Sequence, residues 1–426
     1  MKQFHGIFFT LLICMLSAFN QVNGQFFVDT QLRNRLELRD GYQKLATKGQ
    51  QPALLVSQRT RMTFGFDSDL LKIRFTPQDV RIWGDQAKMS ATGPGDNPSL
   101  DILEAYAELK LGKNIWVSTG RQQLVYDHKR LLGDRNWNQN SISYDAVVFK
   151  LKPKGWNINA GASWNTLVDA LRENPYPKSR IKSLNFLWVN REINNHFKLS
   201  LMHISSGVTK TDTTNALNFR HTTGFYGIYK NKGLTAWGSG YYQYGKNQNG
   251  NNLSALLFDA DISYSKGKLT AGAGIGYLSG NSSIPDNDNT DNLFDPLYGN
   301  RHAFFGNMDY FSNFPAHTKQ GGLADYYLYL DYKISKSIGV KNICHYFTLS
   351  KTNPNTPTDK ALGIENDLLL RYRFSTWGNL EGGYSFMLPT ETLKAVQNVP
   401  DNKFSQFFYL QLTLSTEIFR QTASPL

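Results

Sequence analysis

Apolar and polar residues alternate along most of this chain, in stretches that are separated in turn by short and long connections. Residues 28–39 illustrate the pattern, because Val28, Leu32, Leu36 and Leu38 fall on one face and charged residues fall on the other. A period of two residues is that of a β-strand, whose successive side chains point to opposite faces. The alternation therefore predicts a chain built mainly of half-buried strands.

The connections predict how many strands there are. Tight turns are expected at eight places, namely Asp67-Ser68-Asp69, Gly112-Lys113-Asn114, Pro153-Lys154-Gly155, Asn194-Asn195, Asn231-Lys232-Gly233, Lys266-Gly267, Ser335-Lys336-Ser337 and Trp377-Gly378-Asn379. Nine longer polar stretches alternate with them, at residues 40–53, 84–100, 122–141, 166–183, 206–219, 245–253, 279–323, 350–361 and 389–404. Eight turns and nine loops make seventeen connections, which predicts about 18 strands with both termini at the short-turn rim.

This arrangement is typical of a transmembrane antiparallel β-barrel with short periplasmic turns and long extracellular loops. After residue 24 no apolar run is long enough for a spanning helix, whereas 27 Phe, 22 Tyr and 8 Trp fit the aromatic girdles of a barrel. A secreted soluble β-protein would also alternate, but its strands would not normally be long, Tyr-rich and joined in a strict short–long order. We therefore expect an all-β, multi-pass protein of a Gram-negative outer membrane, in contact with outer-membrane lipid.

The N-terminus forms a separate unit. Residues 1–24 combine a positive start, an apolar segment and a small-residue exit, which is the pattern of a secretory signal peptide. The outer-membrane barrel domain would then comprise residues 25–426. Cys344 is the only cysteine in that domain, so no internal disulfide is expected.

The formal charge of +12 must be placed where water is, because Lys or Arg at the lipid midplane costs about 2–4 kcal/mol. The alternation directs a set of arginines into the lumen, namely Arg33, Arg35, Arg39, Arg59, Arg61, Arg74, Arg371 and Arg373. Barrel closure brings the first and last strands together, so these arginines are predicted to form one basic wall. Guanidinium groups bind carboxylates through paired donors, which makes an anion the expected partner.

Several segments of the first third resemble the alginate-export domain of outer-membrane porins. They are Arg33-Asn34-Arg35-Leu36-Glu37-Leu38-Arg39, Asp79–Asp85, Leu103–Glu108, Gly120-Arg121-Gln122, Arg130–Gly133 with Trp137, and Tyr144-Asp145-Ala146. The resemblance covers residues 26–152 and implies an eighteen-stranded porin that lets an acidic polysaccharide out of the periplasm. It also implies a polymer path along Arg33, Arg35, Arg59, Arg61, Arg81, Arg121 and Arg130, with Glu104, Glu108 and Asp145 as counter-charges. For residues 122–141, both a loop folded inward as a constriction and a loop outside the barrel remain open.

Other chemistries find less support in the sequence. The acidic run Asp286–Asp291 lacks the glycine and glutamate of a helix-loop-helix calcium site, and the histidines show no metal-ligand spacing, so no metal or cofactor is expected. Asp127-His128 could suggest hydrolysis, but no nucleophile motif accompanies this pair. The basic residues form no nucleic-acid reading module. The chain is also too short for a plugged transporter of about 22 strands.

The sequence therefore favours a porin, and not an enzyme, that passively conducts an anionic, alginate-like uronate polysaccharide, with export as the favoured direction. In this interpretation the arginines attract the carboxylates of the solute, while Glu104, Glu108, Asp145, Glu365 and Asp367 keep binding weak enough for release. Periplasmic secretion proteins are candidate partners. The alternative is an uptake porin for small acidic sugars or organic anions, and a third hypothesis is an outer-membrane lipid hydrolase.

Overall fold

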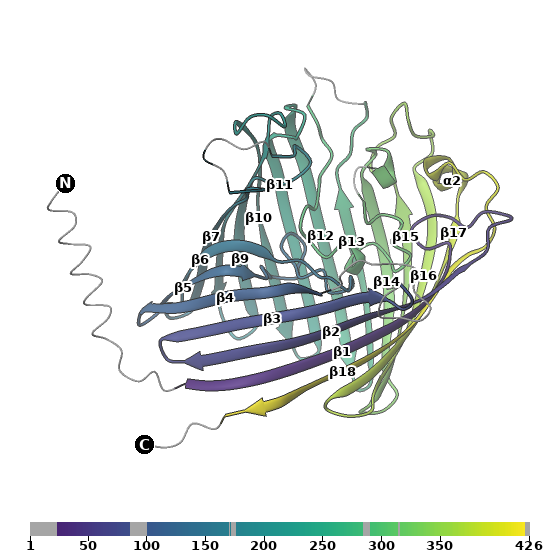
Figure 1. The fold of residues 1–426 in the computed structure, drawn as a ribbon. Coiled ribbons are helices and arrows are strands. Elements are labelled where there is room, and N and C mark those ends of the chain that lie inside the picture. The colour runs from purple at the N-terminus through teal and green to yellow at the C-terminus, as the bar shows by residue number, and fades with distance from the viewer. Residues whose placement is uncertain are drawn as a thin grey trace.

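The computed structural model describes residues 24–85, 100–169, 171, 176–283, 290–313 and 316–421, and it shows one closed barrel of 18 antiparallel strands (Figure 1). Each strand pairs with its neighbours in sequence, and β1 pairs with β18 to close the sheet. The predicted strand number and fold class are thus confirmed. The strands are β1 (Gly24–Asp40), β2 (Ala53–Ser68), β3 (Leu71–Ile82), β4 (Leu100–Gly112), β5 (Ile115–Gln122), β6 (Tyr144–Leu151), β7 (Trp156–Trp164), β8 (Ser183–Glu192), β9 (Phe197–Thr209), β10 (Leu217–Asn231), β11 (Leu234–Lys246), β12 (Asn252–Lys266), β13 (Leu269–Leu278), β14 (Leu323–Lys333), β15 (Ile338–Thr348), β16 (Ala361–Arg373), β17 (Gly378–Pro389) and β18 (Ser405–Arg420).

The connections alternate between short and long as the sequence predicts. Seven of the eight turns lie where they were expected, and the eighth is shifted, because β16 ends at Arg373 and β17 already begins at Gly378. The start of β1 and the end of β18 lie side by side at the rim of the short turns (Figure 1). The opposite rim carries the long loops, including the short helices η1 (Arg301–Ala303), η2 (Ala316–Thr318) and α2 (Glu391–Gln397). By the usual orientation of such barrels, this is the extracellular rim.

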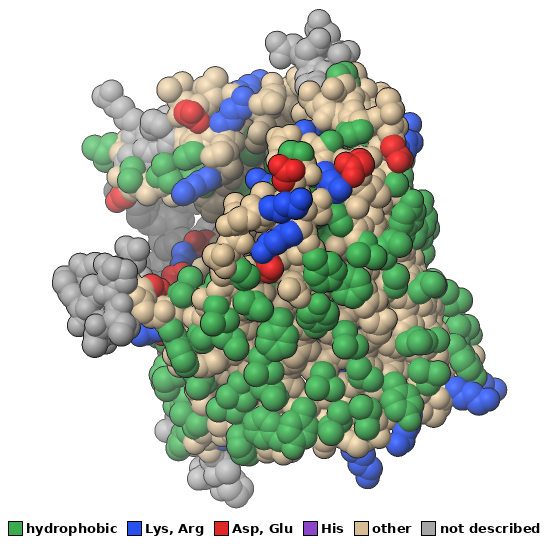
Figure 2. Space-filling model, turned by 90° about the vertical axis from the view of Figure 1, so that its right-hand side faces the viewer, with side chains coloured by type: hydrophobic (Ala, Val, Ile, Leu, Met, Phe, Trp, Pro, Cys, Tyr) green, Lys and Arg blue, Asp and Glu red, His purple; other side chains and the backbone are tan. Residues whose placement is uncertain are grey.

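The outer face of the sheet is apolar. Leu328 at the middle of β14 is 66% exposed, and its neighbours on the same face, Leu330 and Cys344, are also exposed. Figure 2 shows hydrophobic side chains spread over the lower wall, while most Lys, Arg, Asp and Glu on this face gather at the loop end and the lower rim. An apolar band between charged rims fits a surface in contact with lipid.

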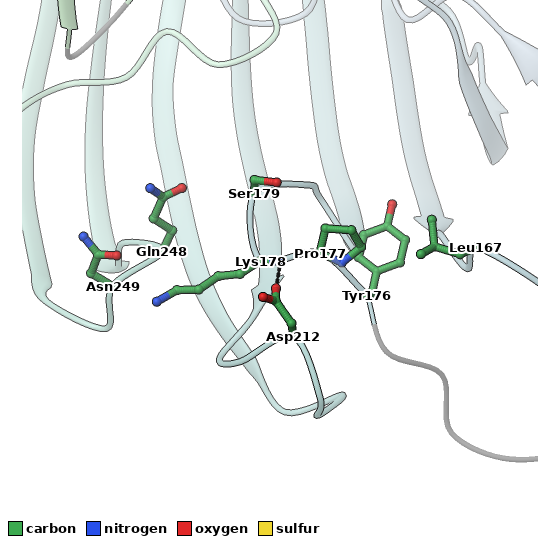
Figure 3. A pocket seen from close by; sticks show the side chains of 8 residues that line it. All are labelled: Leu167, Tyr176, Pro177, Lys178, Ser179, Asp212, Gln248 and Asn249. Carbon is green, nitrogen blue, oxygen red and sulfur yellow. Dashed lines mark hydrogen bonds between the residues drawn. The ribbon is translucent and has the colours of Figure 1, made fainter.

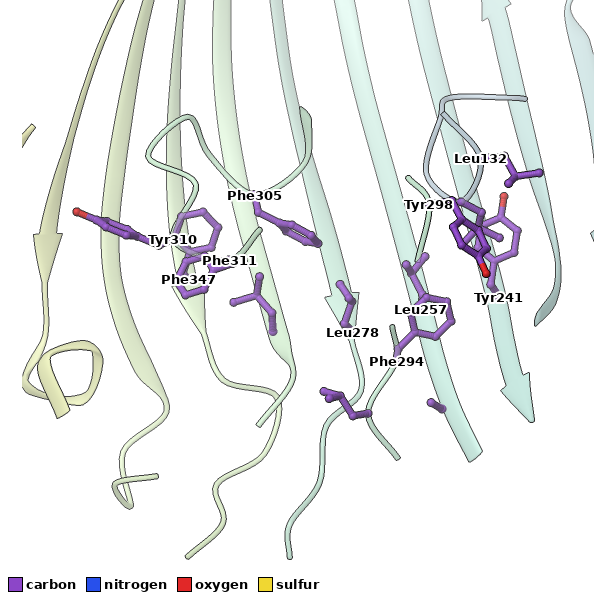
Figure 4. Close-up of a cluster of buried hydrophobic side chains, with 14 of the residues drawn as sticks. Leu132, Tyr241, Leu257, Leu278, Phe294, Tyr298, Phe305, Tyr310, Phe311 and Phe347 are labelled. Atoms are coloured by element: carbon purple, nitrogen blue, oxygen red, sulfur yellow. The ribbon is translucent and has the colours of Figure 1, made fainter. Parts of the chain in front are cut away.

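The inner face of the loop-side half is covered by two long loops that fold into the lumen. The β5–β6 loop (residues 123–143) and the β13–β14 loop (residues 279–322) supply many buried apolar side chains. Figure 4 shows Phe305, Phe311 and Tyr298 of the second loop packed beside side chains of the barrel wall. The barrel therefore contains a hydrophobic core inside its lumen, and the inward alternative for residues 122–141 is the correct one.

The ends of the chain complete the description. The predicted signal peptide, except for Gly24, and Asp286–Asn289 of the acidic run lie outside the described residues. Gly24 itself is the first residue of β1. In the described ranges no helix is long and apolar enough to cross a bilayer.

The inside–outside assignment can be tested by one substitution at two depths. Leu328→Arg should destabilise the folded barrel in lipid by about 2–4 kcal/mol, because the guanidinium would face hydrocarbon, whereas Leu54→Arg near the loop rim should cost about 0–1 kcal/mol. Urea titration of the mature protein in lipid bilayers, followed by the mobility shift between unheated and heated samples on gels, measures both. Equal costs at the two positions would contradict the assignment of the lipid face.

Candidate functional site

Four arginines of β1 and β2 point into the lumen and form what we call the arginine cluster: Arg33, Arg35, Arg59 and Arg61. Arg33 and Arg59 are directly opposite each other in the register of the two strands, so their side chains lie on the same face. Arg33 is 3% exposed and Arg59 is 1% exposed. The strands thus gather several like charges within a small buried volume.

The arginine cluster is bonded to the β5–β6 loop. Arg33 donates from Nε to Gln139 Oε1 at 2.8 Å and from Nη1 to the Asn136 carbonyl at 2.7 Å. Arg35 Nη1 donates to the Trp137 carbonyl at 2.8 Å, and Arg59 Nη1 donates to Asn136 Oδ1 at 3.0 Å. The partners are neutral oxygens that neutralise no charge.

Carboxylates are scarce around these groups. Arg35 pairs with Glu37 at 2.6 Å, and Glu37 also pairs with Arg39. Within the described part of the chain, no carboxylate lies at salt-bridge distance from Arg33, Arg59 or Arg61. Buried charges are normally paired, so three guanidinium groups without a carboxylate at salt-bridge distance are energetically unfavourable, which makes the arginine cluster a candidate functional site.

Trp137 holds the β5–β6 loop between the arginine cluster and the β13–β14 loop. The Arg35 guanidinium lies 3.9 Å from the indole centroid on one side, and the His302 ring stacks at 3.8 Å and 10°. Trp137 Nε1 donates to the Tyr42 hydroxyl at 3.2 Å, and Tyr42 in turn donates to Asp309. Three loops therefore meet at this one side chain, which we call the Trp137 latch.

The two inward loops also cross tightly elsewhere. Gly299 of the β13–β14 loop passes so close to the backbone of the β5–β6 loop that a Cβ atom there would lie 2.0 Å from the Arg130 carbonyl oxygen. The side chain of Arg130 is buried between Phe304 and Phe305 and donates to both oxygens of Asp259 on β12, at 2.8 and 3.0 Å. Arg130, predicted on the polymer path, thus anchors the loop to the wall.

The part of the lumen wall formed by β12, β14 and β16, on the β18 side of β1, is acidic. His345 Nδ1 lies 2.9 Å from Asp325 Oδ1, and its Nε2 lies 3.6 Å from Asp367. Glu365 accepts from the Met308 backbone N–H at 2.8 Å. Carboxylates of β12, β14 and β16 thus face the lumen, and the predicted counter-charges Glu365 and Asp367 belong to this wall.

The remaining lumen-facing residues that the sequence predicted lie nearer the short-turn rim or at the side of the lumen. Arg74 pairs with Asp67 at 2.8 Å and Arg371 with Asp331 at 2.7 Å, while Arg373 is exposed at the end of β16. Glu108 pairs with Lys150, and Glu104 interacts with Arg61 and Arg74.

The predicted basic wall is therefore correct for β1 and β2 and wrong for β16. The arginines of β16 lie toward the short-turn rim, and the part of that strand nearer the loops is acidic.

Three predicted site residues lie outside the lumen. Arg81 pairs with Gln58 across the strands, and Arg121 pairs with Ala105 on one side and Asp145 on the other. The side chains at all of these positions point to the outer face of the sheet. Arg121 Nε donates to Asp145 Oδ1 at 3.0 Å on the exposed surface, and Arg81 pairs with Asp79. The prediction that Arg81 and Arg121 lie on the polymer path with Asp145 as a counter-charge is wrong, because strand parity directs all three side chains away from the lumen.

The geometry does not assemble the hydrolase site that Asp127 and His128 suggested. Asp127 accepts from Ser200 and Trp188, while His128 Nε2 lies 3.4 Å from Ser239 Oγ. Burial, together with the charge of Arg130, lowers the pKa of His128 to about 3. Its neutral ring packs between aromatic side chains, so it serves as part of the core.

Strand parity gave no indication of the loop residues that complete the site, namely Asn136, Gln139, His302 and Asp309, or of the contacts of Trp137. A signal was present in the β13–β14 loop, which contains Phe294, Phe304, Phe305, Tyr310 and Phe311. Such an apolar loop cannot remain in water, and its composition could have indicated that it folds into the barrel.

Comparison with known proteins agrees with this architecture. Similar solved structures include Acinetobacter baumannii OccAB1 (TM-score 0.65, 12% identity, covering 92% of this chain and 97% of that chain). Others are Pseudomonas aeruginosa OccK9 (0.63, 12%, 92% and 98%) and a BenF-like porin from Pseudomonas fluorescens Pf-5 (0.61, 12%, 92% and 99%). At this identity the likeness shows a shared fold. No curated protein matched the chain.

The family assignment comes from the sequence. The model of the alginate export family matches residues 26–395, which includes the arginine cluster, both inward loops and most of the barrel. Since this match extends well beyond the first third of the chain, the resemblance noted there is confirmed. The chain belongs to the alginate export family, and it is a multi-pass porin of the Gram-negative outer membrane.

Proposed function

We propose that this porin passively conducts an anionic, alginate-like uronate polysaccharide along the arginine cluster, with export as the favoured direction. The observation that carries the proposal is the set of buried guanidinium groups without a carboxylate partner. Their donors are occupied by carbonyl and amide oxygens of the β5–β6 loop. A carboxylate presents two oxygens in the plane that such donors favour, and it also brings the missing negative charge.

The β5–β6 loop is then the element that a polymer has to displace. Its oxygens accept from the arginine donors that the carboxylates of the solute would use. The closed state therefore resembles the arginine cluster with a solute bound. Replacing the neutral loop oxygens by the charged carboxylates of the solute favours solute binding. The reason is that charge-assisted hydrogen bonds are roughly twice as strong as neutral ones. The acidic part of the wall on β14 and β16, with Asp325 and Asp367, would repel the same carboxylates and keep them from binding too tightly for passage.

Uptake of small acidic sugars or organic anions is the second candidate, and one observation favours it. Cavities of ≈ 280 and ≈ 520 Å³ lie on the loop side of the lumen, beside the closed β5–β6 and β13–β14 loops. Volumes of this order accommodate small ligands, for which sites of about 300–1,000 Å³ are usual. A small solute also requires less displacement of the loops than a polymer does.

Anion selectivity should depend on the arginine cluster. In planar bilayers the wild-type protein should show a reversal potential that favours chloride, and Arg33→Gln with Arg59→Gln should shift it toward zero, because two uncompensated charges are removed from the lumen. The matched control, Arg81→Gln, removes a charge from the outer face and should leave the reversal potential unchanged. A cation-selective wild type would contradict the proposal.

Substrate class can be tested by block of the small-anion current. A polyuronate should block at concentrations where a neutral glucan has no effect, and Arg61→Lys should weaken that block about tenfold although charge is kept, because an ammonium group lacks planar paired donors. Arg121→Lys on the outer face is the control and should behave as the wild type. Equal block by acidic and neutral polymers would reduce the function to that of a general anion pore.

The Trp137 latch should hold the closed state. Trp137→Ala removes the stacking on Arg35 and His302 and should weaken the closed state by about 1–3 kcal/mol, which raises the open fraction in single-channel records. Trp156→Ala is the control. Trp156 is the first residue of β7 and contacts Arg191 of β8, away from the inward loops. An unchanged open fraction in Trp137→Ala would show that the loop is held by other contacts.

A further inference from the structure

Three cavities on the loop side of the barrel adjoin one another. The outer cavity, of ≈ 510 Å³, lies among the loops that follow β7, β9 and β11 and is lined by Tyr176, Lys178 and Asp212 (Figure 3). It shares Ser179, Gln248 and Asn249 with the middle cavity of ≈ 520 Å³. The middle cavity in turn shares Arg135 and Arg301 with the inner cavity of ≈ 280 Å³. The shared lining residues show that the three cavities follow one another from the outer loops inward.

The middle cavity has a surplus of positive charge. Its lining contains four cations, Arg135, Arg220, Lys246 and Arg301, against the two carboxylates of Asp291 and Asp295. Asp295 accepts from Arg220 at 2.8 Å and from Arg301 at 3.2 Å. These two guanidinium groups hold the pKa of Asp295 below its usual value even though burial acts in the opposite direction. One carboxylate therefore serves two of the arginines.

Several donors in the middle cavity remain available. The side chains of Arg220 and Arg301 line this cavity and are 16% and 20% exposed, so part of each guanidinium group is accessible beside the bond to Asp295. Arg135 donates from Nε and Nη2 to backbone carbonyls, and Lys246 is exposed and forms no ion pair with any described residue. Uncommitted charged donors along a hollow surface are what a carboxylated ligand requires.

The other lining groups of the series suit a sugar. Asn218, Asn249 and Asn251 line the middle cavity, and their amide groups offer both donors and acceptors to hydroxyl groups. The inner cavity ends at the Trp137 latch, on the opposite side of which lies Arg35 of the arginine cluster. The series thus leads from the extracellular loops to the closed entrance of the proposed conduction path.

We propose that these cavities form one extracellular-side track that binds an acidic oligosaccharide. Its carboxylates would lie against Lys246, Arg220 and Arg301, its hydroxyls against the asparagine side chains, and its inner end against the latch. The proposal rests on the proposed function for the class of ligand, and it adds a binding site outside the arginine cluster. The track brings acidic sugars to the latch from the loop side of the barrel.

Binding is tested on the mature, folded protein in detergent by isothermal titration calorimetry. A uronate trisaccharide should bind to the wild type, whereas the neutral trisaccharide maltotriose should not. Lys246→Glu should weaken the uronate binding about tenfold or more, because a charge-assisted contact becomes a repulsive one. The matched control is Lys210→Glu, which makes the same change at an exposed lysine on the β9–β10 loop that lines none of the three cavities.

The outcomes separate this proposal from the conduction proposal. A wild type that binds the uronate trisaccharide but whose current a polyuronate does not block supports the track and contradicts conduction along the arginine cluster. A wild type whose current is blocked but that binds no trisaccharide overturns the track alone. Equal loss of binding in Lys246→Glu and Lys210→Glu would also overturn it, since the effect would then reflect net charge. Lys246→Gln is a second variant that removes the positive charge without adding a negative one. The gel mobility of unheated samples shows whether each variant is folded, so a loss of binding cannot be due to misfolding.

Discussion

Backbone hydrogen bonding imposes the constraint on which the rest of this structure depends. In lipid no water is present to satisfy N–H and C=O groups, so the sheet has to close on itself, and here it closes by pairing β1 with β18. Closure fixes which face of every strand meets lipid and which meets the lumen. It also brings β18 and β2 to either side of β1, so that the charged face of β1 becomes part of the lumen wall.

Closure leaves a wide lumen, and the chain fills its loop-side half with its own loops. The apolar residues of the β13–β14 loop pack against inward apolar residues of the wall, such as Leu257 and Phe347, and this core provides a firm support for the β5–β6 loop. The β5–β6 loop is in turn placed so that its oxygens meet the arginine cluster. The hydrophobic effect thus holds a polar contact that would be weak by itself, because neutral acceptors stabilise buried guanidinium groups only in part.

Charge is divided between two parts of the lumen wall. Guanidinium groups of β1 and β2 face the loop, whereas Asp325, Asp367 and Glu365 lie on β14 and β16 with His345 between them. In the proposed conduction path, an anionic solute would be attracted by the basic part of the wall and repelled by the acidic part, which favours passage over tight retention. The exposed ion pairs on the outside of β3 to β6, including Arg121 with Asp145, do not take part in this division.

The sequence by itself determined the barrel. The two-residue period and the order of short and long connections are local properties, which can be read along the chain without knowing any tertiary contact. It also determined the inward direction of Arg33, Arg35 and Arg59, since parity along one strand needs no knowledge of its neighbours. Parity counted from Glu108 through the intervening turn also places Arg121 outside. What only the tertiary structure decided is where the two long loops go and which arginines they reach. Those contacts join residues about a hundred positions apart, such as Arg33 and Asn136, and depend on the packing of a core that forms only when the barrel has closed.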